Sequence, residues 1–332
     1  MNTKSNNPLT FAGRRGTSAF FLLAMTIAVN SFAEEAITLR QEQNRVIITA
    51  DNHPVATYVF ADKEISRPYF AHVYAPGKIQ VTRNHPPDPA VDAVDHATMH
   101  PGIWLAFGDL SGRDYWRNRA PVRHVRFREL QTEGTVGAFT VENEYLHSGE
   151  PADVVCHETC RYTISIEPNG YLLICDSMFI SPNAFWFGDQ EEMGLGVRMA
   201  TKLTVKAGGG QILDSAGRIN EKQIWSKSAD WCDYRGTLKD RQVGILVMSD
   251  PANFRPMCLH VRDYGLLAAN PFGQKVFGEA EASRVDVPAN TPFRLRFALL
   301  MHASEGKNLD CQDICSKVAA RMKELQRPSV PQ

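Results

Sequence analysis

Short apolar runs separated by turn-forming residues fill most of this 332-residue chain, and they constrain its fold more than any other feature. Between residues 37 and 301 many of these runs alternate apolar and polar side chains, which is the period-two pattern of half-buried β-strands. Asp51-Asn52 and Pro168-Asn169-Gly170 are typical of tight turns between neighbouring strands. We therefore expect an all-β fold with about fifteen strands or more.

A helical pattern occurs near the C-terminus, over residues 310–325 (DCQDICSKVAARMKEL). Acidic residues come first and basic residues last, as the helix dipole favours. No linker-like change of composition interrupts the strand pattern, so we predict one β-sandwich domain over residues 34–327 and a short tail over 328–332. No short repeat is evident, which disfavours a propeller.

The N-terminus has the pattern of a signal peptide. Three basic residues, Lys4, Arg14 and Arg15, precede the apolar run of residues 18–29, and Ser31-Phe32-Ala33 supplies small residues for cleavage. The apolar run is shorter than the roughly 20 residues that a membrane helix needs. We therefore predict a signal peptide over residues 1–33 and an exported protein, either periplasmic or extracellular.

The charge of the predicted mature chain limits its partners. Without residues 1–33 the chain has 33 basic and 37 acidic residues, a net charge of −4. Nucleic acids and anionic membrane surfaces call for basic patches, so neither is expected as a partner. No later segment is long and apolar enough to span a membrane. A small-molecule or glycan ligand is the expected partner.

The seven cysteines do not predict a disulfide framework. Cys156 and Cys160 lie four residues apart on one expected strand, which places their Cα atoms roughly 13 Å apart. Cys311 and Cys315 have the same spacing on the expected helix, which is also poor geometry for a bridge. Most of these thiols are expected to be buried, and a pair more distant in sequence could still bridge.

The segment from residue 67 to 116 holds four of the ten histidines and is rich in proline and glycine, as binding loops often are. The imidazoles of His85, His96 and His100 could serve in acid–base chemistry or donate hydrogen bonds to a polyol. They could instead hold copper, zinc or iron. Because neither an HxH nor an HExxH spacing is present, no metal cofactor is expected.

Paired carboxylates form a second candidate feature, because Glu191 and Glu192 precede a glycine-rich strand. The catalytic candidates are therefore His96, His100, Glu191 and Glu192. Trp116 and Trp231 have charged neighbours and are candidates for exposed aromatic platforms. No serine-hydrolase elbow, phosphate-binding loop or dinucleotide fingerprint is present. The candidates for substrate binding are Arg67, His85, Trp116, Arg198, Trp231, Asp233, His260 and Asn270.

Several of these segments resemble a bacterial family of exported proteins labelled PmoA-like, or "methane oxygenase PmoA". The resemblance rests on RPYFAHVYAPGKIQVTRNHPP, DHATMHPGIWLAFGDLSGRDYWRN and FGDQEEMGLGVRMAT, with shorter matches at residues 217–225, 229–236, 250–256 and 262–273. It covers nearly the whole predicted mature chain. The resemblance implies a shared fold and shared site positions, and it implies no particular reaction.

We therefore predict a large β-sandwich with one C-terminal helix, by analogy the supersandwich of galactose-mutarotase-like proteins. The candidate residues are expected to converge on one cleft. The favoured function is a carbohydrate-active enzyme, an epimerase, lyase or hydrolase, that acts on a sugar or sugar acid by histidine and carboxylate acid–base chemistry. The alternatives are a non-catalytic carbohydrate-binding protein and a histidine-ligated metalloprotein.

Overall fold

The computed structural model describes residues 36–147, 153–238, 240–305 and 309–325, together with Met1, Lys4 and Pro8. The chain divides into two units, Met1–Ala33 and Glu34–Gln332, and the fold below is that of the second unit. Apart from those three isolated residues, the predicted signal peptide lies outside the described residues, as does the predicted tail. No helix within the described ranges is long and apolar enough to cross a membrane.

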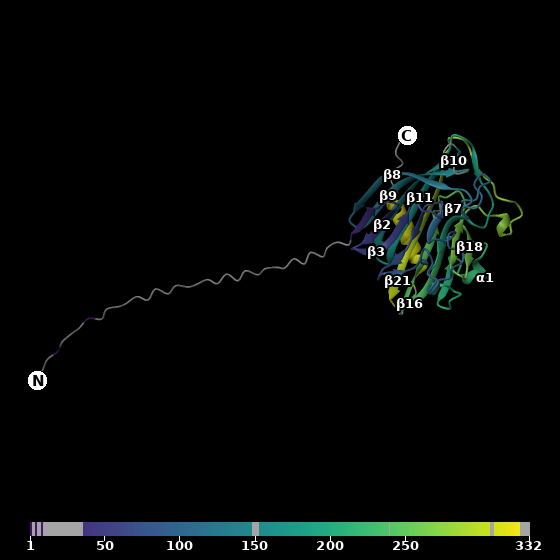
Figure 1. Cartoon of the computed structure of the whole chain (residues 1–332). Coiled ribbons are helices and arrows are strands. Elements are labelled where there is room, and N and C mark those ends of the chain that lie inside the picture. Colours follow the sequence, from purple (N-terminus) through teal and green to yellow (C-terminus); the bar gives the residue numbers. More distant parts are fainter. Residues whose placement is uncertain are drawn as a thin grey trace. The chain divides into compact units, whose positions relative to one another are not determined.

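Two large antiparallel sheets make up the fold (Figure 1). The nine-stranded sheet has the order β1 (Ile37–Gln41), β2 (Arg45–Ala50), β3 (His53–Val59), β4 (Tyr69–Ala71), β7 (Ile103–Phe107), β13 (Met193–Arg198), β19 (Leu266–Asn270), β18 (Cys258–Arg262) and β15 (Lys227–Ser228). The eight-stranded sheet has the order β14 (Gly210–Asp214), β16 (Trp231–Leu238), β17 (Arg241–Ser249), β21 (Phe293–Glu305), β11 (Gly170–Ile180), β10 (Val154–Glu167), β9 (Val136–Leu146) and β8 (Val122–Glu133).

The remaining elements of the described ranges are two short strand pairs, two α-helices and two 3₁₀ turns. Two-stranded pairs are formed by β5 (Tyr74–Ala75) with β6 (Ile79–Gln80) and by β12 (Phe185–Phe187) with β20 (Val285–Val287). The helices are α1 (Asn220–Ile224), α2 (Cys311–Glu324) and two 3₁₀ turns, Thr201–Leu203 and Lys275–Phe277. The prediction of an all-β sandwich with a C-terminal helix is confirmed, whereas α1 was not predicted.

Several of these turns and helix ends follow from local features of the sequence. Asp51 and Asn52 join β2 to β3 with φ of 49° and 61°, the left-handed values that a two-residue hairpin turn of this kind requires. Pro168-Asn169 joins β10 to β11. Asp310 accepts a hydrogen bond from the backbone N–H of Asp313 and so caps the N-terminus of α2.

The main core lies between the two sheets. Alternate residues of each strand point inward, so that Ile103, Leu105 and Phe107 of β7 join the inward-facing residues of β11 and β21 in one apolar cluster. Tyr58 packs against Phe70, Phe139 and other rings in this cluster, with ring centroids 5.0 Å apart in both of those pairs. All seven cysteines are free thiols. The sulfur atoms of the core residues Cys160 and Cys175 lie 3.7 Å apart.

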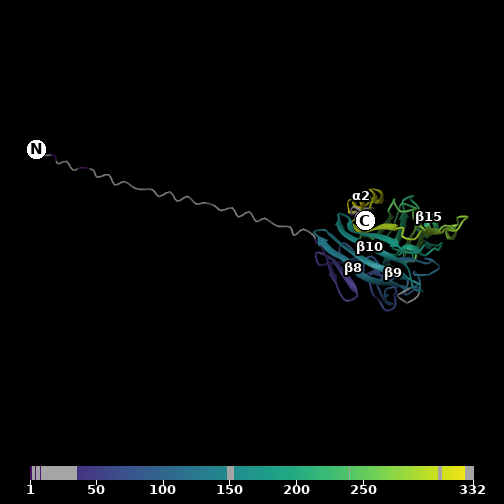
Figure 2. The same ribbon diagram turned by 90° about the horizontal axis from the view of Figure 1, so that it is seen from above.

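Helix α2 covers the outer face of the eight-stranded sheet (Figure 2). Its apolar side packs on residues such as Leu172, Leu246 and Trp231. Beneath it lies a buried ionic group, in which Asp233 accepts a hydrogen bond from His302 at 2.9 Å and lies 3.4 Å from Arg235. Burial alone would raise the pKa of Asp233, but His302 and Arg235 together hold it below its ordinary value.

This buried ionic group predicts a large effect of substitution. Asp233→Asn should lower the free energy of unfolding by about 3 kcal/mol, because it leaves the guanidinium of Arg235 buried without a counter-charge. Urea denaturation of the purified protein measures this change. As a control, Asp313→Asn removes an exposed pair with Lys317 on α2 and should cost less than about 0.5 kcal/mol. Equal, small losses for both variants would contradict the assignment.

Candidate functional site

The outer face of the nine-stranded sheet is covered by the long connection between β6 and β7 and by residues just after β7. The strands present small or polar residues on this side, among them Gly196 and Arg198 of β13 and His260 of β18. Trp104 of β7 and Trp116 pack here in a separate apolar cluster with Tyr69 and Leu266. The prediction that Trp116 forms an exposed platform is wrong, because its side chain is fully buried.

A column of nearly parallel rings rises from this sheet. The ring of His100 stacks on Trp104 at 5.1 Å, that of His96 on His100 at 4.8 Å, and that of Tyr264 lies 6.1 Å from His96. Any side chain at Gly196 would overlap the indole of Trp104, so the absence of a Cβ there allows the column to approach β13. The column carries His96 outward to the surface.

An ion pair fixes the orientation of His96. The carboxylate of Asp95 accepts a hydrogen bond from His96 Nδ1 at 2.8 Å, and Arg198 Nη2 donates to both of its oxygens at 2.8 and 2.9 Å. Although burial acts to raise the pKa of Asp95, these partners and Arg83 lower it to about 2. An ionised carboxylate only accepts hydrogen bonds, so the Nδ1 of His96 is the donor in this contact, and in the neutral ring the lone pair lies on Nε2.

The backbone at His96 is also unusual. Its φ is +51°, in the left-handed region that few residues other than glycine adopt, although asparagine, aspartate and histidine are enriched there. Such strain persists where the surroundings enforce it, and it is frequent at functional sites. Here Arg83 enforces it, because its guanidinium donates to the backbone carbonyls of Ala93, Asp95 and His100 at 2.8, 2.6 and 3.1 Å.

His100 has a different role from His96. Its side chain is fully buried, and its Nε2 accepts a hydrogen bond of 3.4 Å from the indole N–H of Trp116. Burial, reinforced by Arg198, lowers the pKa of His100 to about 2, so the imidazole is neutral. Because it is buried with its acceptor nitrogen occupied, His100 supports the ring above it and cannot reach a ligand.

The predicted carboxylates belong to two ion-pair groups on the same face. Glu191 is about half-exposed, and one of its oxygens lies 3.4 Å from His260 Nδ1 and 3.6 Å from Arg262. Glu192 is largely buried, pairs with Arg117 and lies 4.0 Å from His100 Nε2. Burial raises the pKa of Glu192, and the positive charge of Arg117 opposes this only in part.

Two predicted substrate-binding residues are anchors for loops instead. Arg67 is buried and donates to the carbonyls of Met99 and Tyr115 and to Asn118. Asn270 is buried and donates to the carbonyls of Gln190 and Glu191, while its own carbonyl oxygen accepts from two backbone N–H groups of the turn after β19. Since both side chains are buried and make these contacts to the backbone, neither is exposed to a ligand.

Trp231 and Asp233 do not join the other candidates. Both lie on β16 of the eight-stranded sheet, and their side chains face α2. Their predicted place in a shared site is therefore wrong. The strand pattern could not show this, because it does not tell which of the two sheets a strand enters.

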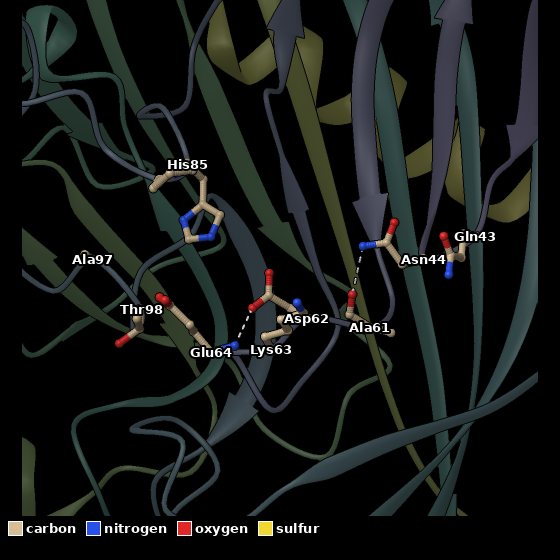
Figure 3. Close-up of a pocket in the computed structure, with 10 residues that line it drawn as sticks. Gln43, Asn44, Ala61, Asp62, Lys63, Glu64, His85, Ala97 and Thr98 are labelled. Atoms are coloured by element: carbon tan, nitrogen blue, oxygen red, sulfur yellow. Dashed lines mark hydrogen bonds between the residues drawn. The ribbon is translucent and has the colours of Figure 1, made fainter.

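Two cavities adjoin the column. The His96 cavity, of about 380 Å³, is lined by Asp95, His96, Thr201, Thr204, Lys206 and Tyr264. The His85 cavity, of about 890 Å³, is lined by residues that include Asn44, Asp62, Glu64, His85 and Thr98 (Figure 3). His85 packs edge-on against Tyr69 at 5.1 Å, and burial lowers its pKa to about 4.

Some residues of the site were not singled out from the sequence. Tyr264 lies in the turn just after β18, and Arg117 stands directly after Trp116. A signal was present in the segment RDYG, where charged and aromatic residues precede the positive-φ Gly265 at a turn between two strands. Lys206 had no such signal, because it lies in an ordinary polar loop.

The histidines do not form a metal site. Within the described ranges, no three His, Cys, Asp or Glu side chains are grouped so that they could hold a metal ion. His96 and His100 present parallel faces to each other, and His85 packs on Tyr69. The arrangement therefore gives no support to the alternative of a histidine-ligated copper, zinc or iron centre.

Comparison with known proteins places this sandwich, with its polar outer face, in a family. Residues 45–314 match the model described as "Family of unknown function (DUF6807)", and the chain belongs to that family. No curated protein matches its sequence.

Among solved structures, the chain is similar to a GalM/aldose epimerase homologue from C. elegans, with 8% identity over 82% of this chain and 100% of that chain and a TM-score of 0.36. It is also similar to a GH36 α-galactosidase from Geobacillus stearothermophilus (12% identity, 81% of this chain, 41% of that chain, TM-score 0.40) and to a galactose mutarotase-like protein from Lactobacillus casei (8%, 80%, 100%, 0.39). Because these TM-scores lie below 0.5, the fold class rests on the chain's own strands.

The buried imidazoles give a prediction about pH. His100 and His260, whose pKa burial lowers to about 2 and about 3, should stay neutral while the protein is folded. Unfolding returns them to an ordinary pKa of about 6.5, so the unfolded chain binds more protons and stability should fall as the pH drops below that value. Nitrogen-15 NMR of the imidazoles measures their protonation directly. Titration of either ring between pH 5.5 and 7.5 would contradict this description.

Proposed function

We propose that this protein is a carbohydrate-active enzyme in which His96 is the acid–base residue. The observation that supports this most is the chain of contacts from Arg198 through Asp95 to His96 Nδ1, at 2.8 to 2.9 Å. It fixes the tautomer and the ring plane, and Nε2 has no partner among the described residues. An exposed, oriented imidazole beside a cavity is suited to accept a proton from a hydroxyl or from a carbon next to a carbonyl.

The carboxylates supply the second half of the chemistry. Glu192, whose pKa burial raises, holds a proton more readily than an ordinary glutamate and is suited to act as the acid. Glu191 is more exposed, and its contacts with His260 and Arg262 orient it to accept hydrogen bonds from substrate hydroxyls. This division gives the two carboxylates different roles.

The surroundings of His96 favour a sugar or sugar acid as substrate. The half-buried ring of Tyr264 lines the cavity and offers apolar surface to the C–H side of a sugar ring, and the charged groups beside it can bind hydroxyls. Arg67 and Arg198 are buried and hold loops within the protein, whereas Lys206 lines the His96 cavity and can pair with a substrate carboxylate. Epimerisation, elimination and hydrolysis are all compatible with these groups.

We place this activity outside the cytoplasm, on the support of the signal-peptide pattern at residues 1–33. The resemblance to exported proteins labelled PmoA-like supports the same location. The proposed chemistry uses the side chains of the site and needs no metal ion or nucleotide.

Substitution of His96 tests the proposal. A panel of neutral sugars, uronic acids and their oligosaccharides is incubated with the protein, and products are detected by NMR and chromatography. His96→Ala should lower turnover by about 10²- to 10⁴-fold, the usual contribution of a positioned acid–base group. Binding measured by calorimetry should change much less, because His96 acts mainly in the transition state.

The control is His53→Ala, which removes an exposed imidazole at the start of β3, far along the sheet from β13. It should leave turnover unchanged. Full turnover in His96→Ala would remove His96 from the mechanism. A wild-type protein that binds sugars of the panel but converts none would favour the non-catalytic carbohydrate-binding protein.

A further inference from the structure

The His96 cavity and the His85 cavity lie on either side of one short stretch of chain. Asp95 and His96 line the first, whereas the next two residues, Ala97 and Thr98, line the second. His96 therefore stands at the boundary between them. A ligand that entered both cavities would pass beside its imidazole.

The His85 cavity is large enough to hold a whole ligand. Its volume is about 890 Å³, and that of the His96 cavity is about 380 Å³. Pockets that enclose a whole drug-sized ligand have volumes of about 300–1,000 Å³. Each cavity alone is therefore large enough for a sugar ring, and together they have room for several.

Polar groups in the His85 cavity are available to a ligand. Figure 3 shows the imidazole of His85 and the carboxylate of Glu64 turned toward the same space, with Thr98 beside them. No side-chain partner of Glu64 occurs within the described ranges. Asp62 differs, because its carboxylate accepts hydrogen bonds from Tyr69 and from the backbone N–H groups of Glu64 and Ile65, and so shapes the wall.

The chemistry of this wall fits hydroxyl groups better than anions. The carboxylates of Asp62 and Glu64 outnumber the one cation among the lining residues, Lys63, so they disfavour a negatively charged ligand, while they accept hydrogen bonds from neutral donors. The imidazole of His85 is neutral, so it can accept or donate one hydrogen bond. The amide of Asn44 and the hydroxyl of Thr98 add further donors and acceptors on the same wall.

We propose that the His85 cavity is a second sugar-binding subsite, and that the substrate is an oligosaccharide or polysaccharide that extends from there across His96. This inference rests on the proposed function and narrows its substrate class from single sugars to chains. The sugar unit in the His85 cavity is uncharged, and its hydroxyls bind Glu64, His85 and Thr98.

Calorimetry with sugars of increasing length tests this inference. The probes are ladders of one to six residues of β-1,4-linked glucose, β-1,4-linked N-acetylglucosamine and a uronic acid. Titrations use the His96→Ala background so that chains are not consumed. Affinity should rise with chain length. Glu64→Ala should weaken binding of the longest chains about tenfold, as expected for one hydrogen bond to a charged group, and leave monosaccharide binding unchanged.

Two further variants sharpen the test. Thr98→Trp places a large side chain in the cavity next to His96 and should abolish the rise of affinity with chain length, while Glu133→Ala, at the exposed end of β8, should behave like the parent. Thermal unfolding checks that each variant is folded. If Thr98→Trp is not folded, Glu64→Ala alone decides whether the second subsite exists. If sugars bind but their affinity does not rise with chain length, or if it rises equally in Glu64→Ala, the second subsite is overturned while the proposed function stands. If no ladder binds at any length, both are overturned.

Discussion

The ion pair between Arg198 and Asp95 is the interaction on which the arrangement of the site depends. Arg198 points outward from β13 and is almost fully buried, so its charge must be neutralised within the protein. Asp95 supplies that charge from the long connection between β6 and β7. Arg83, also buried, binds the backbone carbonyls of the same connection. Two buried cations thus hold a loop against the sheet in one conformation, and that conformation positions His96.

The ring column acts together with this ion pair. Trp104 lies flat on the sheet because β13 has glycine beneath it, and His100 stacks on Trp104 with its acceptor nitrogen satisfied by Trp116. The buried histidine is neutral and serves as a rigid spacer, whereas the exposed histidine above it keeps a nitrogen lone pair. Two imidazoles four residues apart therefore differ in environment, because burial and partners differ, and only the outer one is both oriented and exposed.

The sequence allowed the class of fold to be predicted, because strand alternation, the turn at Asp51-Asn52 and the helix over residues 310–325 are local signals. It also located the segment that carries His96. It could not show that the side chains of Arg67 and Asn270 donate hydrogen bonds to backbone carbonyls, because those partners lie about 30 to 80 residues away along the chain. The separation of Asp233 from the site has the same origin. Sheet order is set by long-range pairing, as where β13 pairs with β7 and β19, and periodicity within a strand carries no information about it.

The two outer faces of the sandwich are covered by different kinds of structure. On the eight-stranded sheet, α2 seals the face, and the ionic group around Asp233 lies in an interior where its charges satisfy one another. On the nine-stranded sheet the cover is a loop, which leaves cavities on both sides of His96 and keeps several polar groups accessible. Similar residue types are therefore buried in mutual contacts on one face and accessible beside cavities on the other. The difference lies in what covers them, since a helix can satisfy its own backbone while a loop must be held by buried side chains such as Arg83 and Arg67.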